Sequence, residues 1–209
     1  MLDFQLLGMF SLASILLALS PGPDNLFVLT QSMAKGSKVG ILITLGLCSG
    51  LVFHTLAVAL GVAVIFQTSL FAFNALKIVG ASYLMYLAYF AFKESGKTEL
   101  KTKEVSLSWA KLYKRGLIMN ITNTKVSIFF LAFLPHFVNP TMGNVTMQIV
   151  ILCLVFMVCA FSVFSCIAFL AGRLGKWFFQ TKHGESILNK LAGAVFVGIA
   201  IKLLLSERE

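Results

Sequence analysis

The chain has 209 residues, of which 58% are hydrophobic and only 12% are charged. Soluble domains are near half apolar and about one quarter charged, so the composition excludes an ordinary soluble domain and indicates an integral membrane protein. The formal net charge of +9 would suit a nucleic-acid-binding protein, but its placement in alternate loops, described below, argues against that class.

Six apolar segments are long enough to cross a bilayer as helices, which takes about 20 residues. We expect them at residues 4–34, 39–66, 70–92, 116–138, 146–171 and 187–206. The start of the first, "MLDFQLLGMF", contains no Lys or Arg, so we expect it to be retained rather than cleaved as a signal peptide. The predicted fold is an all-α integral membrane protein with six transmembrane helices in one transporter domain, residues 1–209.

The first segment is too long for one straight crossing, and the stretch "SPGPDN" interrupts it. Pro21 and Pro23 remove backbone donors and Gly22 weakens a helix, so we expect a broken helix. Asp24 and Asn25 follow directly. Asp24 is the only acid within the predicted spans. A charge at the bilayer centre costs about 2.5–3.5 kcal/mol, which makes Asp24 a candidate functional residue.

The second and third predicted spans each carry an ionisable residue. His54 follows Gly46 and Gly50 at intervals of four, which places all three on one helix face. The glycines form a GxxxG pair that permits close helix contact. His54 is then either a neutral, hydrogen-bonded packing residue or a charge-coupling group. Lys77 is either a charge-coupling group or a lysine whose stem reaches outward to the headgroups.

Basic residues gather in every second connection. The connections "QTSL" and "VNPTMGNVTMQ" carry none. By the positive-inside rule the basic connections, including the loop at residues 93–115, are cytoplasmic, and we expect both termini outside. The basic residues of these connections, with Lys190 just inside the sixth span, are Lys35, Lys38, Lys93, Lys97, Lys101, Lys103, Lys111, Lys114, Arg115, Arg173, Lys176, Lys182 and Lys190.

The basic loop separates two halves of three spans each, residues 1–92 and 116–209. Because three is odd, the halves have opposite orientations, as in many secondary transporters. The second half also opens on a disturbed helix, where "NITNTK" places Asn120, Asn123 and Lys125 before an apolar run. Paired interruptions indicate a transport site. The alternative is an ordinary proline kink together with a polar interfacial cap on the fourth span.

Asp24 and Lys125 have opposite charges and would link the two broken helices if they met. Such a pair is either a static ion pair that locks the halves together, or a functional pair. In the functional reading, Asp24 takes up and releases a proton, or exchanges Lys125 for a substrate amino group.

Classes other than transporters find little support. All four cysteines, Cys48, Cys153, Cys159 and Cys166, fall within predicted spans without a CxxC pair, so we expect buried free thiols. The sequence has no GxSxG or HExxH motif and no aspartate pair. We therefore expect no enzyme, no metal site and no cofactor.

Three stretches, "SPGPDNLFVLTQSMAKGSKVG", "YKRGLIMNITNTKVSIFFLAFLPHFV" and "LAGAVFVGIAIKLLL", resemble the lysine exporter superfamily in its threonine/homoserine exporter (RhtB-like) branch. The resemblance covers nearly the whole chain. It implies a six-span carrier of the bacterial inner membrane that exports amino acids, driven by the proton-motive force. The family's Asn-Pro-Lys motif falls on residues 123–125, where Thr124 replaces the proline, so the second break should be softer.

The predicted function is secondary-active export of amino acids or related small metabolites (threonine-, homoserine- or leucine-like) by alternating access. A passive channel and an inorganic-ion exporter are the alternatives. The expected partners are a small-molecule substrate and the lipid bilayer, with a homodimer left open and no nucleic acid. The expected substrate-binding residues are Pro21, Gly22, Pro23, Asp24, Asn25, Asn120, Asn123 and Lys125. The expected charge-coupling residues are Asp24, Lys125, Lys77 and His54.

The topology is testable by cysteine labelling in intact cells. A membrane-impermeant reagent should modify a cysteine introduced in residues 138–147, because that loop carries no basic residue and is expected outside. It should not modify a cysteine introduced at Lys101. Modification at Lys101 would reverse the predicted orientation.

Overall fold

The computed structural model describes residues 4–20, 22–68 and 108–180, together with isolated residues between 78 and 93 and between 190 and 204. All regular structure within these described residues is helical, without a strand. Most of the predicted spans at 70–92 and 187–206, including Lys77, lies outside the described residues, as does Pro21. The count of six spans therefore stays a prediction.

The first predicted span is a bent pair of helices. Helix α1 (Phe4–Leu19) and helix α2 (Pro23–Lys35) meet at an angle of 60°. Gly22 is extended at the break, and Pro23 is the first residue of α2, a position where its missing N–H has no intrahelical partner to lose. The predicted break at "SPGPDN" is confirmed.

Helices α3 (Ser37–Thr68) and α7 (Val145–Gln180) are the longest helices among the described residues, with 32 and 36 residues. Within the described residues they are the two helices that are long and apolar enough to span a membrane alone, over Ser37–Gly61 and Val145–Ala171. Counting each bent pair as one span raises the number to four. The predictions at 39–66 and 146–171 are close, although α7 continues to Gln180.

The second bent pair begins earlier than predicted. Helix α5 starts at Trp109 and ends at Ile121, so placing residues 109–115 in a loop was wrong. In α5 the buried residues Leu112, Gly116 and Asn120 recur every four positions, which gives this basic segment one buried face and one exposed face.

Helix α6 (Thr124–Ile128) follows at 47° and continues into a π-helical turn (Phe129–Phe133) and a 3₁₀ turn (Leu134–Phe137). This bend is smaller than the 60° at Pro23. Thr124 keeps its backbone N–H and lacks the ring that forces a sharper kink.

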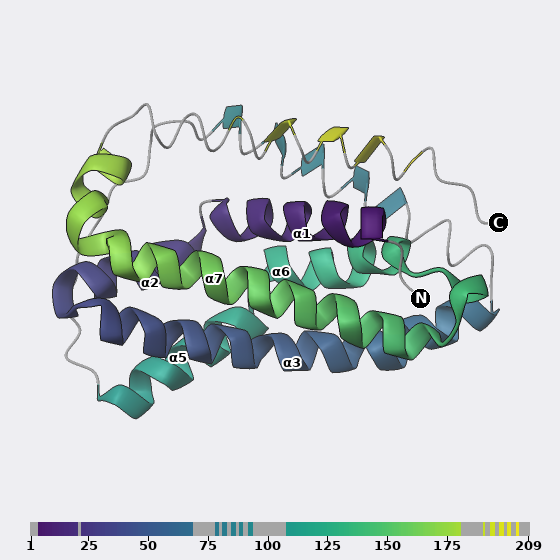
Figure 1. Ribbon diagram of the computed structural model, residues 1–209, viewed down its shortest axis with the longest axis horizontal. Coiled ribbons are helices and arrows are strands. Elements are labelled where there is room, and N and C mark those ends of the chain that lie inside the picture. The colour runs from purple at the N-terminus through teal and green to yellow at the C-terminus, as the bar shows by residue number, and fades with distance from the viewer. Residues whose placement is uncertain are drawn as a thin grey trace.

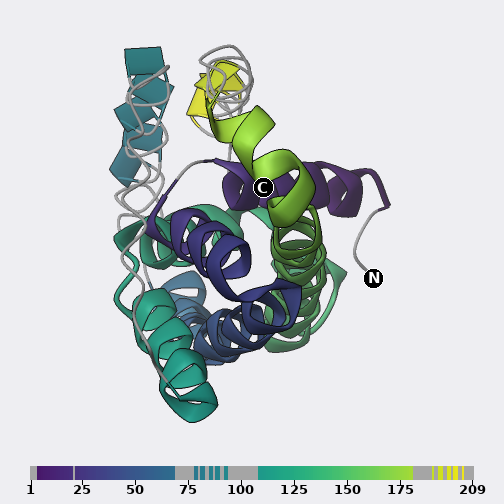
Figure 2. The same cartoon turned by 90° about the vertical axis from the view of Figure 1, so that its left-hand side faces the viewer.

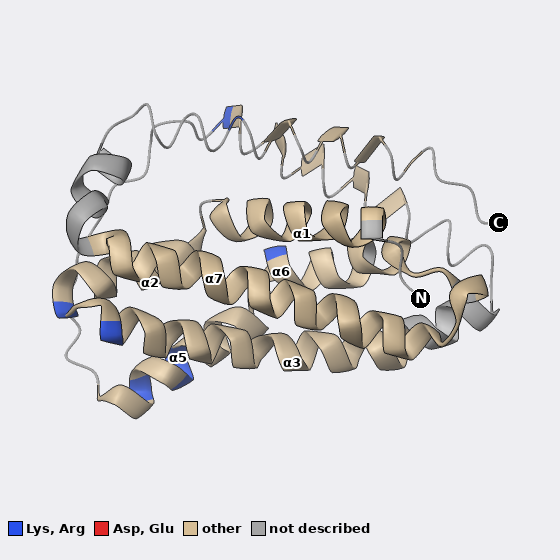
Figure 3. Cartoon of the chain, in the orientation of Figure 1, with Lys and Arg blue, Asp and Glu red and all other residues tan. Residues whose placement is uncertain are grey.

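The two bent pairs run in opposite directions (Figure 1). Helices α1 and α2 run from right to left in that view, whereas α5 and α6 run from left to right. Seen from its left-hand end, the structure groups α2, α3 and α7 around one centre, with α5 against α3 on the outside (Figure 2). Lys and Arg of the α2–α3 junction and of α5 lie at that left-hand end, and the basic residue of α6 lies in the middle (Figure 3).

Glycines let α3 and α5 cross closely. A Cβ on Gly46 would collide with the carbonyl oxygen of Tyr113, and a Cβ on Gly116 would lie 2.6 Å from that of Ile43. A Cβ on Gly50 would lie 2.7 Å from the side chain of Asn120. The predicted close contact at Gly46 and Gly50 is confirmed, and its partner is α5.

Replacing Gly46 by Ala should lower the free energy of unfolding in detergent by about 1–3 kcal/mol, because the added methyl overpacks a backbone contact. The matched control is Gly61→Ala in the same helix, where a Cβ would meet nothing within 4 Å. Chemical denaturation followed by tryptophan fluorescence measures both. Equal effects of the two substitutions would contradict the tight crossing.

Candidate functional site

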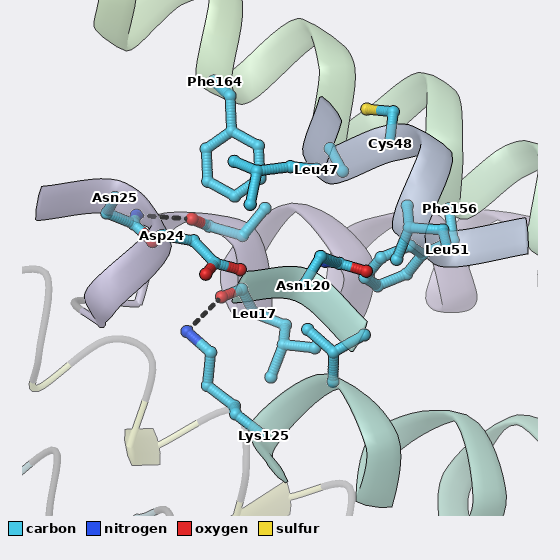
Figure 4. Close-up of a pocket in the computed structure, with 13 residues that line it drawn as sticks. Leu17, Asp24, Asn25, Leu47, Cys48, Leu51, Asn120, Lys125, Phe156 and Phe164 are labelled. Atoms are coloured by element: carbon cyan, nitrogen blue, oxygen red, sulfur yellow. Dashed lines mark hydrogen bonds between the residues drawn. The ribbon is translucent and has the colours of Figure 1, made fainter. Parts of the chain in front are cut away.

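The two helix breaks meet at one pocket (Figure 4). Asp24 and Asn25 enter it from the start of α2, and Asn120 and Lys125 enter it from the two sides of the second break. Its volume is about 20 Å³, counted as the space open to the centre of a water molecule, which is room for roughly one or two waters. The lining residues are Leu17, Ala18, Asp24, Asn25, Leu47, Cys48, Leu51, Asn120, Lys125, Val126, Phe156, Ala160 and Phe164.

Asn123 connects the two breaks. Its side-chain nitrogen donates to Oδ2 of Asp24 at 2.7 Å, and its side-chain oxygen accepts from the backbone N–H of Lys125 at 3.0 Å. The second bond is the N-cap of α6. Because the cap fixes which end of the amide faces the helix, the nitrogen points at Asp24, and Asp24 is held by the opposite half of the chain.

Asn25 satisfies the carbonyls left free where α1 ends. The last carbonyls of a helix have no intrahelical partner. The Asn25 side-chain nitrogen donates to the carbonyl oxygen of Ala18 at 2.6 Å and to that of Leu19 at 3.4 Å. The residue after Asp24 thus caps the preceding helix.

Lys125 binds the same end of α1 from the other half. Its ammonium donates to the carbonyl oxygens of Leu17 at 3.2 Å and Ser20 at 2.9 Å. A cation at a helix C-terminus is also favoured by the helix dipole. Gly22 permits this approach, since a Cβ there would lie 3.2 Å from the lysine nitrogen.

In place of the direct Asp24–Lys125 bond that the charges suggested, the two side chains make three bonds to other groups. Both residues line the same pocket, but Asp24 accepts from Asn123 while Lys125 donates to the backbone of α1. The physical reason is that the broken end of α1 presents carbonyls that compete for the ammonium.

His54 supports the second break from α3. Its Nε2 lies 3.1 Å from the backbone carbonyl oxygen of Asn120, and because a carbonyl only accepts, Nε2 is the protonated nitrogen. This is the hydrogen bond expected of a packing histidine, while charge coupling by His54 stays a prediction. His54 does not line the pocket.

Three side-chain oxygens at the pocket are buried without a hydrogen-bond partner. They are Oδ1 of Asp24, Oδ1 of Asn25 and Oδ1 of Asn120. The three residues are only 3%, 2% and 2% exposed. These three oxygens could each still accept a hydrogen bond.

Comparison with known proteins identifies the family of the chain. The sequence matches the profile of the LysE type translocator family over residues 15–207. The chain belongs to this family. Its assignment as a translocator confirms the resemblance and the expectation that the protein is not an enzyme.

Relatives of this LysE type translocator include proteins with functional names. It is 33% identical to the homoserine/homoserine lactone efflux protein of Salmonella typhimurium, over 95% of each chain. It is 28% identical to the leucine efflux protein of the same species, over 93% of this chain and 92% of the relative. It is also 29% identical to the uncharacterized membrane protein YrhP of Bacillus subtilis, over 97% and 99%. No solved structure matches.

The apolar wall of the translocator's pocket was not predicted from the sequence. Leu47 and Leu51 come from α3, and Phe156 and Phe164 come from α7. Their spacing of four and eight positions would fit any buried helix face. Cys48 also lines the pocket. Only Cys153 is buried, whereas Cys48 and Cys159 are partly buried and Cys166 is exposed, so the expectation of four buried thiols was wrong for three of them.

Replacing Lys125 by Met should lower the free energy of unfolding of the LysE type translocator by about 1–3 kcal/mol, because two carbonyls at the end of α1 lose their donor. Lys114→Met is the matched control, since Lys114 is exposed on α5 and such substitutions stay within about 0.5 kcal/mol. Thermal unfolding in detergent compares them. A Lys125→Met protein as stable as Lys114→Met would contradict the capping role.

Proposed function

We propose that the protein is a secondary-active exporter of amino acids or closely related small metabolites, driven by the proton-motive force. The observation that carries the proposal is the meeting of the two helix breaks at one polar pocket, with Asp24 of the first half held by Asn123 of the second. Discontinuous helices that meet in this way are the usual substrate sites of secondary transporters. The names of the relatives, which include homoserine and leucine efflux proteins, support small amino acids as substrates.

The proposed architecture is six spans in two inverted three-helix repeats. The opposite directions of α1–α2 and of α5–α6 (Figure 1) support it, because inversion turns the first helix of each repeat around. The basic residues at one end of the structure (Figure 3) support a cytoplasmic face there. We place both termini outside a bacterial inner membrane.

The proposed coupling group is Asp24. One of its oxygens is fixed by Asn123, while Oδ1 has no partner. A proton and a positively charged substrate group would compete for Oδ1, because an oxygen that carries the proton no longer accepts a cation well. Competition of this kind exchanges protons from outside for substrate from inside. Lys125 contributes by position, since its ammonium holds the end of α1 to α6.

Transport in proteoliposomes tests the proposal. With an imposed pH gradient, the wild-type protein should accumulate labelled L-homoserine or L-leucine and should exchange it in counterflow. Saturable counterflow distinguishes a carrier from a channel. A second test challenges cells that express the protein with a toxic excess of each amino acid in turn. If expression relieved the toxicity of none of them, export of amino acids would be contradicted.

Asp24→Asn keeps the shape of the side chain and removes its titration. We expect this variant to exchange substrate in counterflow at saturating concentration, with weaker affinity, but to lose accumulation driven by a pH gradient. The control variant must not add a charge, which excludes Gln31→Glu. Gln31→Ala, on the same helix and outside the pocket, should retain both activities. Accumulation by Asp24→Asn equal to wild type would exclude Asp24 as the coupling group.

A further inference from the structure

Helix α3 holds its neighbours tightly near the basic end of the structure. A Cβ on Gly40 would collide with Oγ of Ser32 in α2 and would lie 2.6 Å from the Cβ of Ala168 in α7. The crossing of α3 with α5 at Gly46 is equally close. Close-packed surfaces of this kind contain few voids and do not deform continuously. Helices α2 and α5 are therefore both fixed to α3 on this side of the pocket.

A side-chain contact bridges α2 and α5 directly. The guanidinium carbon of Arg115 lies 4.8 Å from the centre of the Phe27 ring, which is within the range of a cation–π interaction. Phe27 is partly buried, whereas Arg115 is exposed. The contact thus joins the first half of the chain to the second, and water reaches one of its two partners.

This contact lies between the pocket and the basic end. Phe27 follows Asp24 by three positions, so the two side chains are neighbours on one face of α2. Arg115 precedes Asn120 by five positions, which is about 7–8 Å along α5. Asp24 and Asn120 line the pocket, whereas Phe27 and Arg115 do not. A path from the basic end to the pocket between α2 and α5 therefore reaches Arg115 and Phe27 first.

Moving the arginine is the change that opens this path with the least loss of contact. A cation–π contact at an exposed site is weak, and exposed side chains change rotamer within nanoseconds. Moving α2 or α5 away from α3 would instead disrupt the close contacts at Gly40 or Gly46.

We infer that Arg115 and Phe27 form a side-chain gate on the cytoplasmic side of the pocket. The gate is closed when the guanidinium covers the ring and open when the arginine turns out into water, while the helices stay packed on α3. The inference rests on the proposed export function for the direction of transport, whereas access to the pocket is measurable without transport.

Cys48 reports access because it lines the pocket. A membrane-impermeant maleimide is applied to inverted membrane vesicles, which expose the cytoplasmic face, and to spheroplasts, which expose the outer face. Mass spectrometry of the Cys48 peptide separates its labelling from that of the other cysteines. Arg115→Gln should raise the labelling rate in inverted vesicles about two- to fivefold, the change in population that an exposed cation–π contact accounts for. The rate in spheroplasts should not change.

Lys114→Gln is the matched control, because it removes the same charge from the next residue of α5, which is also exposed. It should leave both rates unchanged. Phe27→Leu removes the ring and should match Arg115→Gln, whereas Phe27→Tyr keeps a ring and should match wild type. Because Arg115→Gln and Phe27→Leu break the same contact, the double variant should be labelled no faster than the faster single variant.

Three results would overturn the gate. They are an unchanged rate with Arg115→Gln, an equal rise with Lys114→Gln, and effects of Arg115→Gln and Phe27→Leu that multiply in the double variant. An equal rise in spheroplasts would also overturn it, because it would show loosening of the whole protein rather than opening on one side. The expected labelling pattern in a protein that transports no amino acid would instead contradict the proposed export function alone.

Discussion

A helix that breaks inside a membrane must find hydrogen-bond partners within the protein, because lipid offers none. Here the partners of each break come partly from the other half of the chain. The end of α1 is bound by Asn25 and by Lys125, and the start of α6 is capped by Asn123, which also holds Asp24. Three hydrogen bonds link the two breaks to each other. This mutual dependence explains why a polar cluster persists in a chain that is 58% hydrophobic.

Local chemistry made part of this structure predictable from the sequence. Gly22 weakens a helix and Pro23 lacks a backbone N–H. Both effects are local to the residue, so the first break could be predicted. The i, i+4 spacing of Gly46, Gly50 and His54 defines one helix face, so close packing and a bonded histidine could be predicted too. The polar residues at the breaks could be identified because placing polar groups inside a membrane costs free energy.

The rest of the site depends on contacts between residues that lie far apart in the sequence, which no local sequence pattern shows. Opposite charges suggested a bond from Asp24 to Lys125, but the pattern could not show that carbonyls of α1 lie within 3.2 Å of the ammonium. The start of α5 at Trp109 was missed because its lysines suggested a loop, although its buried face lies between them. The leucines and phenylalanines of the pocket are ordinary core residues until the helices that carry them are brought together.

Aromatic side chains are concentrated on one side of the pocket. Phe156 lines the pocket and packs against Phe129 at 5.3 Å and Phe130 at 4.9 Å between ring centres. Phe133 and Phe10 extend the same buried group. The turns after α6 lie toward the right-hand end of Figure 1, away from the basic end. Each aromatic pair adds about 0.5–1.5 kcal/mol beyond burial of its area, so this side is closed by many small contacts.

The alternating access expected of the proposed exporter would require this aromatic side to open. Opening the aromatic side must separate several rings at once, and the π-helical turn at Phe129–Phe133 is a place where a helix can change its hydrogen bonding without unfolding. That turn follows directly on α6, whose first residues hold Asp24 through Asn123 and the end of α1 through Lys125. Under the proposed export function, a substrate bound at Asp24 would act on this same short helix through Asn123. The polar site and the aromatic group are therefore joined directly through the short helix α6 and the π-helical turn that follows it.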